Sequence, residues 1–268
     1  MSPDPQTLWA VLLAGAVGAL LLGGLFAAFL LGRAGPPDSR RREGSLVVPA
    51  VGIDFAYWTI DPLVDGLHRL GFRPNHVTAF SLYVAALTGL LLAAGHLTVG
   101  FWLLLLTGLC DLVDGHLARR QRRDSPAGAF FDSFADRVAE AFIFGGLAYW
   151  GAGGWLTWLA IWALFASLAI SYARARGESL GAPGAVGLMQ RPERMVLLAV
   201  TLFVSPLIAV GLDRPAELPA SIGVALLAML ASVTAWRRAR SIFDELTERE
   251  APVSPPASRR PMLDQGRE

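Results

Sequence analysis

The stretch DLVDGHLARRQRRDSPAGAFFDSFADR, residues 111–137, lies where two long and mostly apolar runs meet, Val99–Ala118 and Gly128–Trp150. Each run has about the 20 residues that a helix needs to cross a hydrocarbon core roughly 30 Å thick. They qualify as spans only if their acidic residues are accepted inside the membrane or at its edge. We therefore predict two transmembrane helices joined by a short arginine-rich loop.

Four aspartates in this stretch are spaced for a common site. Asp111 and Asp114 are three residues apart, and Asp132 and Asp136 are four apart, so each pair shares a helix face. Because the loop is short, we expect the two helices to be antiparallel neighbours whose carboxylates converge. Such a cluster is unfavourable without cations. Oxygen ligands suit Mg²⁺, Mn²⁺ or Ca²⁺, and four carboxylates are enough for two ions.

Small residues lie beside these carboxylates. Gly115 and Ala118 follow Asp111 by one and two helical turns, and Gly128 precedes Asp132 by one turn. We expect this face to leave a hollow in which a ligand approaches the backbone. Arg119 is suited to bind a phosphate there. Glu140, one turn beyond Asp136, is assigned no role, although pairing with Arg137 is open.

The rest of the chain extends the apolar pattern. The 268 residues are 54% hydrophobic, with a mean hydropathy of +0.48, whereas soluble domains are about 45–50% apolar. We predict an all-α, polytopic transmembrane helix bundle. Its seven spans are Leu8–Leu31, Val77–Gly95, Val99–Ala118, Gly128–Trp150, Gly154–Ala173, Met195–Leu212 and Leu218–Trp236. The first is expected to be a retained anchor, because it is too long for a signal peptide and lacks a basic segment before it.

Arginine placement predicts the orientation, since the chain has no lysine. With alternating topology, the loops that follow spans one, three, five and seven lie on one side. These loops hold nearly all the arginines near span ends, and only Arg214 lies on the other side. By the positive-inside rule the arginine-rich side is the cytoplasm. The aspartates of residues 111–137 are therefore expected to face the cytoplasm in a multi-pass membrane protein. The arginines are a topology signal, and no nucleic-acid partner is indicated.

Other segments complete the predicted organisation. Leu46–Leu70 mixes aromatic and charged residues as an interfacial helix does, with Pro62 as a kink or break. We divide the chain into an N-terminal anchor and basic linker (1–43), a main domain (44–240) and a cytoplasmic tail (241–268) that we expect to be disordered. The single cysteine, Cys110, excludes an internal disulfide and is expected to pack in the core.

The pattern D-x-x-D-G-x-x-A-R, eight residues, G-x-x-x-D-x-x-x-D over Asp111–Asp136 resembles, without departure, the signature of the CDP-alcohol phosphotransferases. The resemblance extends over about Leu46 to Arg240. It implies six transmembrane helices preceded by an interfacial helix, so the first span is an addition. It also implies a transferase that moves a phosphatidyl-type group from a CDP-linked lipid, such as CDP-diacylglycerol, to a small alcohol with release of CMP.

The resemblance assigns roles residue by residue. Asp111, Asp114, Asp132 and Asp136 would hold two metal ions, Mg²⁺ or Mn²⁺, and Asp136 would also be the general base. The segment RPNHVT resembles a short family element, although Pro-Asn before a helix also makes a good N-terminal cap. The implied CDP-binding residues are Gly115, Ala118, Arg119, Gly128, Pro74, Asn75 and Thr78.

The acceptor is expected to contact a second segment, SYARARGESLGAPGAVGLMQRPERM, which begins at Ser171. It resembles the branch of the family that uses inositol phosphate. The implied acceptor residues are Ser171, Arg174, Arg191 and Arg194, with Arg237 or Arg238 closing the pocket and Arg237 preferred. Arginine forks suit a phosphate monoester, although these arginines also satisfy the positive-inside rule and could contact anionic lipid headgroups. Glycerol 3-phosphate and serine remain alternative acceptors.

One non-enzymatic alternative is a cation or proton transporter, since carboxylates inside membranes often mark ion pathways. A transporter predicts acidic residues distributed through the membrane depth. Here the acidic residues are confined to one level, and the last three spans have none. The sequence therefore favours the enzyme. A homodimer is left open.

Overall fold

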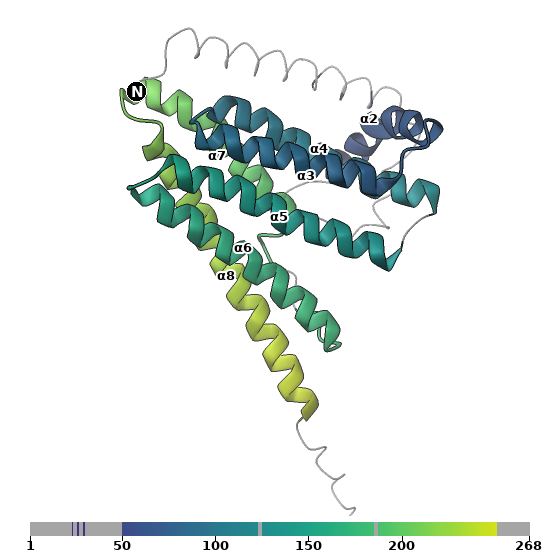
Figure 1. Cartoon of the computed structure of the whole chain (residues 1–268). Coiled ribbons are helices and arrows are strands. Elements are labelled where there is room, and N and C mark those ends of the chain that lie inside the picture. Colours follow the sequence, from purple (N-terminus) through teal and green to yellow (C-terminus); the bar gives the residue numbers. More distant parts are fainter. Residues whose placement is uncertain are drawn as a thin grey trace, which may run out of the picture.

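The computed structural model describes residues 50–122, 125–184 and 187–250, together with Gly23, Phe26 and Phe29. The described part of the chain is helical and has no strand, which confirms the all-α prediction (Figure 1). The helices are α2 (Ala50–Arg69), α3 (Pro74–Ala93), α4 (Leu97–Gln121), α5 (Pro126–Trp150), α6 (Trp155–Ser179), α7 (Arg191–Leu212) and α8 (Glu217–Glu250).

Five described helices, α3, α4, α6, α7 and α8, are long and apolar enough to cross a membrane. Each coincides with a predicted span. The helix α5 has 25 residues, also enough to span. It is outside that group because it carries the charged residues Asp132, Asp136, Arg137 and Glu140. The predicted first span, Leu8–Leu31, lies outside the described residues except for three helical positions.

Local chemistry explains where the helices begin and end. Pro74 and Pro126 lie in the first turns of α3 and α5, where the missing amide hydrogen costs nothing. Ser125 caps α5 by accepting a hydrogen bond from the Gly128 amide at 3.1 Å. The helix α3 ends at Gly95, whose φ of +83° suits glycine. Because α3, α4 and α5 follow one another through short connections, α3 and α5 begin, and α4 ends, at the same end of the bundle.

The packing order corrects one prediction. We expected α4 and α5 to be packed neighbours, but α3 packs extensively against both, and the two make almost no direct contact. The reason lies in two glycines. A Cβ on Gly89 of α3 would collide with the Phe142 carbonyl of α5, and one on Gly146 would collide with the Gly89 carbonyl. The backbones of α3 and α5 therefore touch, and α5 lies across α3 from α4.

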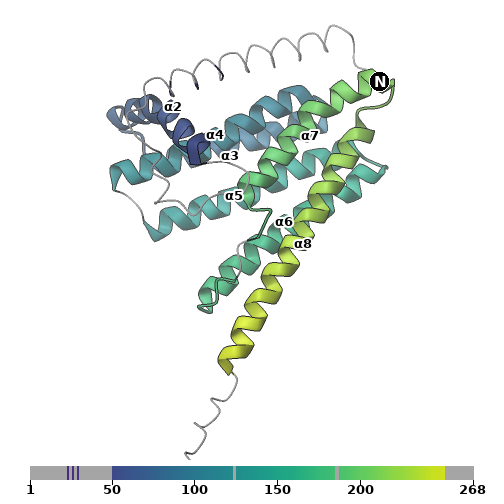
Figure 2. The same ribbon diagram turned by 180° about the vertical axis from the view of Figure 1, so that it is seen from behind.

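The helices α6 and α8 form an extended pair that projects beyond the other helices (Figures 1 and 2). The loop after α6 packs on α8, with Gly184 against Ile242 and Gly187 against Thr234. Arg249 donates a hydrogen bond to the Gly181 carbonyl at 2.8 Å. Residues 241–250 therefore continue α8 as helix, which corrects their assignment to a disordered tail. The remainder of that predicted tail, 251–268, lies outside the described residues.

The helix α2 packs against the end of α4. Ile60 and Val64 of α2 form a small buried cluster with Val77, Val113 and Cys110, which confirms the prediction that Cys110 is a core residue. The helix runs through Pro62 without a break. Its position at one end of the bundle agrees with the expected interfacial helix (Figure 1).

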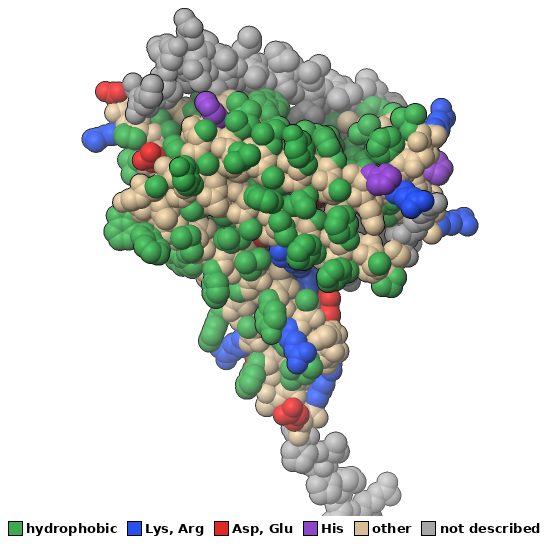
Figure 3. All heavy atoms as spheres, in the orientation of Figure 1, with side chains coloured by type: hydrophobic (Ala, Val, Ile, Leu, Met, Phe, Trp, Pro, Cys, Tyr) green, Lys and Arg blue, Asp and Glu red, His purple; other side chains and the backbone are tan. Residues whose placement is uncertain are grey.

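The outer surface of the bundle is apolar, as a lipid-facing surface requires. Large side chains such as Tyr83, Leu90, Trp155 and Phe165 are each more than 60% exposed. Hydrophobic side chains cover the broad body of the molecule, whereas several arginines lie on the projecting part and at the edges (Figure 3). An exposed apolar belt of this extent is stable in lipid and not in water, so the chain is an integral membrane protein.

Candidate active site

The last turns of α4 carry two of the four aspartates, and α3 holds both of them through hydroxyl groups. Thr78 donates a hydrogen bond to Asp114 Oδ2 at 2.7 Å, and Ser81 donates one to Asp111 Oδ1 at 3.2 Å. Thr78, predicted to contact the nucleotide, thus directly orients a predicted metal ligand. Ser81 was not singled out in the sequence, although it lies one turn after Thr78 on the same face of an apolar helix.

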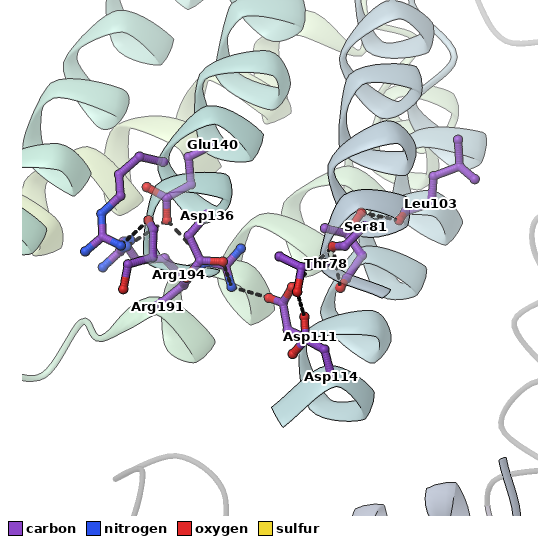
Figure 4. Close-up of polar contacts among 12 residues, drawn as sticks. Thr78, Ser81, Leu103, Asp111, Asp114, Asp136, Glu140, Arg191 and Arg194 are labelled. Atoms are coloured by element: carbon purple, nitrogen blue, oxygen red, sulfur yellow. Dashed lines mark hydrogen bonds and ion pairs between the residues drawn. The ribbon is translucent and has the colours of Figure 1, made fainter. Parts of the chain in front are cut away.

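The other two aspartates lie on α5, and Asp136 faces Arg191 at the start of α7. Arg191 Nη1 lies 2.8 Å from Asp136 Oδ1 and also pairs with Asp111. Figure 4 shows the guanidinium between the α4 and α5 carboxylates. Arg191 was predicted as an acceptor residue. The structure instead puts its cationic end between two predicted metal ligands while the same side chain lines the neighbouring cavity.

The carboxylates fit a divalent metal in chemistry and charge. Asp132 repels Asp111, Asp114 and Asp136 electrostatically, so all four share one region of negative potential. A guanidinium already bridges two of them, which indicates a position that requires a cation. Among the described residues no three such side chains stand close enough to enclose an ion. Side-chain movement, including that of Arg191, is therefore needed before the oxygens can act together.

A polar contact between α2 and α4 flanks the predicted nucleotide residues. Arg119 donates a hydrogen bond to the Tyr57 hydroxyl at 2.9 Å and stacks over its ring. His116 Nε2 lies 2.6 Å from Asp61 Oδ1, and Arg120 pairs with Asp65. No local pattern predicts these three pairs, because α2 and α4 are distant in the chain. They fix the end of α4 against the interfacial helix.

The two predicted nucleotide-binding glycines differ in the space beside them. A Cβ on Gly115 would come no closer than 3.7 Å to Arg119, so the space beside it is open. A Cβ on Gly128 would lie 3.1 Å from Ser125 Oγ and 3.7 Å from Asn75 Oδ1. Asn75 and the adjacent Pro74 are therefore beside the start of α5. Ala118 is half-buried between Gly115 and Arg119 on α4.

A cavity of about 880 Å³ opens next to the α5 aspartates and is lined by α5, α6, α8 and the beginning of α7. Asp132 and Asp136 form part of one wall. The opposite walls carry a hydroxyl and four arginines, which are Ser171, Arg174, Arg191, Arg194 and Arg238. Arg137 of α5 and Glu178 of α6 also line it, so α5 contributes most of the carboxylates, and α6, α7 and α8 contribute most of the guanidinium groups.

Of the two arginines predicted to close the acceptor pocket, the cavity lining favours Arg238 over Arg237. Arg237 is exposed, whereas Arg238 is 6% exposed and lines the cavity. The buried stripe of α8 contains Ala231, Thr234, Arg238 and Ile242. Neighbouring helical residues point about 100° apart, so the phase of this stripe selects Arg238.

A buried ion pair closes the inner end of the cavity. Arg194 Nη2 lies 2.7 Å from Glu140 Oε1, and both side chains are 5% exposed. Arg194 Nη1 also donates a hydrogen bond to the Met189 carbonyl at 3.1 Å. Glu140 was assigned no role from the sequence, and the pairing with Arg137 that was left open does not form. Arg137 instead bonds the Ser133 carbonyl.

Comparisons with known proteins agree with this geometry. The sequence profile of the CDP-alcohol phosphatidyltransferase family matches residues 72–236. A phosphatidylinositol phosphate synthase of Mycobacteroides abscessus is 38% identical over 145 residues. That alignment covers 52% of this chain and 65% of the relative, so the chain spans just under two thirds of that relative's length.

Two solved structures of the Mycobacterium tuberculosis phosphatidylinositol phosphate synthase have the same fold. One contains CDP-DAG, and the alignment covers 68% of this chain and 92% of that one, with 29% identity and a TM-score of 0.61. The other contains manganese and citrate, and covers 68% and 88% with the same identity and score. With a family profile that matches most of the chain and the signature aspartates beside a charged cavity, this chain belongs to the CDP-alcohol phosphatidyltransferase family.

Proposed function

We propose that this chain transfers a phosphatidyl-type group from a CDP-diacylglycerol-like lipid to a phosphorylated alcohol, with inositol phosphate as the acceptor and CMP as the other product. The observation that carries the proposal is the cavity of about 880 Å³ with Asp136 on one wall and Arg174, Arg194 and Arg238 on the others. A phosphate monoester with a hydroxyl at its other end suits such a cavity, because it can present a negative charge to arginines and a hydroxyl to a carboxylate.

The relatives support both substrates. The similar curated protein is named for phosphatidylinositol phosphate synthesis, and a solved relative was crystallised with CDP-DAG. The donor's chains would remain in lipid, against the apolar outer surface, and its nucleotide would lie beside Gly115, Ala118, Arg119 and Gly128.

The enzyme is metal-dependent, as a relative solved with manganese supports. We propose that Asp111, Asp114, Asp132 and Asp136 hold two ions, either Mg²⁺ or Mn²⁺. Bound there, the ions would polarise the donor's pyrophosphate and neutralise charge on the departing CMP. Thr78 and Ser81 orient Asp114 and Asp111 through hydrogen bonds, and such partners fix the direction of ligand oxygens.

Asp136 is the proposed general base. It lines the cavity and carries no protein hydrogen-bond donor other than Arg191 in the described part of the chain. Its carboxylate would accept the proton of the acceptor hydroxyl as that oxygen bonds to the β-phosphorus of the donor. The bond from this phosphorus to the CMP oxygen breaks in the same displacement.

The arginines would hold the acceptor's phosphate. Arg174 is exposed at the cavity mouth and pairs with Glu178 at 2.8 Å, so it can exchange that surface partner for a phosphate. Arg194 and Arg238 are buried further in, and Ser171 adds a hydroxyl. Arg191 can turn to the phosphate when it leaves Asp111 and Asp136. Buried guanidinium groups favour a charged acceptor over a neutral one such as serine.

The site is proposed to face the cytoplasm. The loops that carry most arginines lie at the same end as the aspartates, and the positive-inside rule assigns that end to the cytoplasm. The inositol phosphate would then be taken from the cytosol.

The test is CMP release by the purified full chain with Mg²⁺ or Mn²⁺ and CDP-diacylglycerol. The acceptors compared are inositol phosphate, glycerol 3-phosphate, inositol and serine. We expect inositol phosphate to give the highest kcat/KM, and unphosphorylated inositol to be a poor acceptor. Equal use of inositol phosphate and glycerol 3-phosphate would contradict the proposal that inositol phosphate is the specific acceptor. A preference for serine would contradict the proposal that the arginines of the cavity bind the acceptor's phosphate. Transport of metal ions or protons without CMP release would favour the transporter alternative.

A further inference from the structure

Two acid–arginine pairs connect α5 to α7 one helical turn apart. Asp136 pairs with Arg191 at 2.8 Å, and Glu140 pairs with Arg194 at 2.7 Å. A diagonal approach of 3.9 Å joins Arg191 Nε to Glu140 Oε1. Figure 4 shows these four side chains together on one side of the site. Of these four residues, Glu140 has no part in the proposed chemistry, so its contact with Arg194 needs its own explanation.

The two pairs differ in their access to solvent. The side chains of Asp136 and Arg191 are each 20% exposed, whereas those of Glu140 and Arg194 are each 5% exposed. Glu140 and Arg194 also line a small space with Ile143, Phe144 and Leu198, which are apolar. In such surroundings a charge is unfavourable unless it is paired. The inner pair is therefore expected to persist while the outer one exchanges partners.

Helix packing alone does not fix the arginines. The helices α5 and α7 make little direct backbone contact, since α7 packs mainly against α4 and α8. The position of Arg194 relative to Asp136 therefore depends on two contacts of its guanidinium. One is the Glu140 carboxylate, and the other is the Met189 carbonyl at 3.1 Å. Glu140 lies on the same helix face as Asp136, so it ties the proposed phosphate-binding arginine to the proposed base.

We propose that Glu140 is a positioning residue for the acceptor site: its carboxylate holds Arg194 at the inner end of the cavity, at a set distance from Asp136. This inference rests on the proposed function, because it assumes that Arg194 binds the acceptor's phosphate. Glu140 makes no contact with substrate in this role. Its charge also limits how strongly Arg191 is drawn to Asp111 and Asp136, because it attracts the same guanidinium from the other side.

The test compares Glu140→Gln with Glu140→Asp. Glutamine keeps the length and one oxygen for Arg194 but removes the charge, whereas aspartate keeps the charge with a shorter reach. We expect Glu140→Gln to raise the apparent KM for inositol phosphate by about tenfold or more. The KM for CDP-diacylglycerol should change less than about twofold, and Glu140→Asp should recover part of the loss. Glu245→Gln, which removes an exposed partner of Arg249 and does not line the cavity, is the matched control.

A purely structural role predicts a different result. If Glu140→Gln lowered the apparent kcat in proportion to a loss of folded protein and left both KM values unchanged, the positioning role would be overturned. If Glu140→Gln did not fold, the double variant Glu140→Gln/Arg194→Gln would be compared with Arg194→Gln. Because the two residues act as one unit, the double variant should have the same acceptor KM as Arg194→Gln. A further increase would contradict the proposal.

Failure of the inference is distinguishable from failure of the proposed function. Wild-type protein that uses inositol phosphate, combined with an unchanged acceptor KM in Glu140→Gln, would reject only the role of Glu140. Wild-type protein that releases no CMP with any phosphorylated acceptor would reject both.

Discussion

The two halves of the site hold their carboxylates in different ways. On the α3–α4 side, neutral hydroxyls of Thr78 and Ser81 donate to Asp114 and Asp111. On the α5–α7 side, Asp136 and Glu140 meet guanidinium groups. A hydroxyl orients a carboxylate and leaves its negative charge available, whereas an arginine neutralises it. We infer that the hydroxyls orient the proposed metal ligands of α4, whereas the α5–α7 side combines the proposed metal ligands Asp132 and Asp136 with arginines that would face an anionic acceptor. Asp111 takes part in both, because it also pairs with Arg191.

Asp136 and Arg191 lie where the two halves meet. Arg191 bridges Asp136 to Asp111 and also lines the cavity. Its partial exposure allows it to leave the carboxylates, which Arg194, buried with Glu140, cannot readily do. A side chain that competes with metal for one set of partners and binds phosphate in another position would link metal binding to acceptor binding.

Loss of an α4 carboxylate should have the largest effect. Asp114→Asn keeps the hydrogen bond with Thr78 within reach but removes a charged metal ligand. We expect CMP release to fall by at least about 10⁴-fold, the upper end of what a general base contributes, and Mn²⁺ binding measured by electron paramagnetic resonance to weaken. Asp244→Asn, on the exposed surface of α8, serves as the control. Full Mn²⁺ affinity in Asp114→Asn would remove Asp114 from the metal site.

Asp136→Asn separates base catalysis from nucleotide binding. The amide cannot accept the acceptor's proton, so turnover should fall by about 10²–10⁴-fold. Binding of CDP-diacylglycerol, measured by calorimetry in detergent, should stay near the wild-type value because three other carboxylates remain. A rate close to wild type would show that another group accepts the proton.

The hydroxyl contacts should have a smaller effect that is confined to metal binding. Thr78→Val and Ser81→Ala each remove one donor to an aspartate. Outer partners of this kind contribute about 10–100-fold to metal affinity, so the Mn²⁺ concentration for half-maximal rate should rise by that order. Thr88→Val, a buried hydroxyl on α3 that bonds only to Val84 in its own helix, is the matched control. An equal shift in the control would mean that the loss reflects packing.

The smallest expected effect distinguishes two neighbouring arginines. Arg238→Ala should raise the KM for inositol phosphate, because Arg238 is buried in the cavity wall. Arg237→Ala should change it by less than about twofold, as is usual for exposed positions. Steady-state rates of CMP release measure both. The reverse ranking would restore the sequence-based choice of Arg237 and change the orientation of α8.

Much of the fold could be predicted because hydropathy is local. The five apolar described helices coincide with predicted spans, and helix ends follow from residues such as Pro74 and Gly95 around α3 and Ser125 and Pro126 at the start of α5. The order of packing could not be predicted in this way. The contact of Gly89 with Gly146 depends on two helices that are distant in sequence, and glycine is common in transmembrane helices. A short loop suggested that α4 and α5 are neighbours, but it permits α3 between them.

The residues of the site also fall into those that a local sequence pattern predicts and those that depend on distant helices. The four aspartates could be identified because their spacing is contained within one stretch and resembles a family signature. Ser81, which donates to Asp111, and Tyr57, which accepts from Arg119, lie on other helices, where no local pattern marks them. Glu140 was missed because a lone acid one turn beyond Asp136 resembles a surface residue until Arg194 is brought to it. Arg238 replaced Arg237 because the helix phase depends on packing against α6.

One set of initial-rate measurements tests most directly whether the α3–α4 side serves metal binding and the α5–α7 side serves acceptor binding. CMP release is recorded against Mn²⁺ concentration and against inositol phosphate concentration for wild type, Thr78→Val and Arg194→Gln. We predict that Thr78→Val shifts only the Mn²⁺ curve and that Arg194→Gln shifts only the inositol phosphate curve. If either variant shifted both curves by the same factor, the two halves would not have separate roles and the account would be wrong.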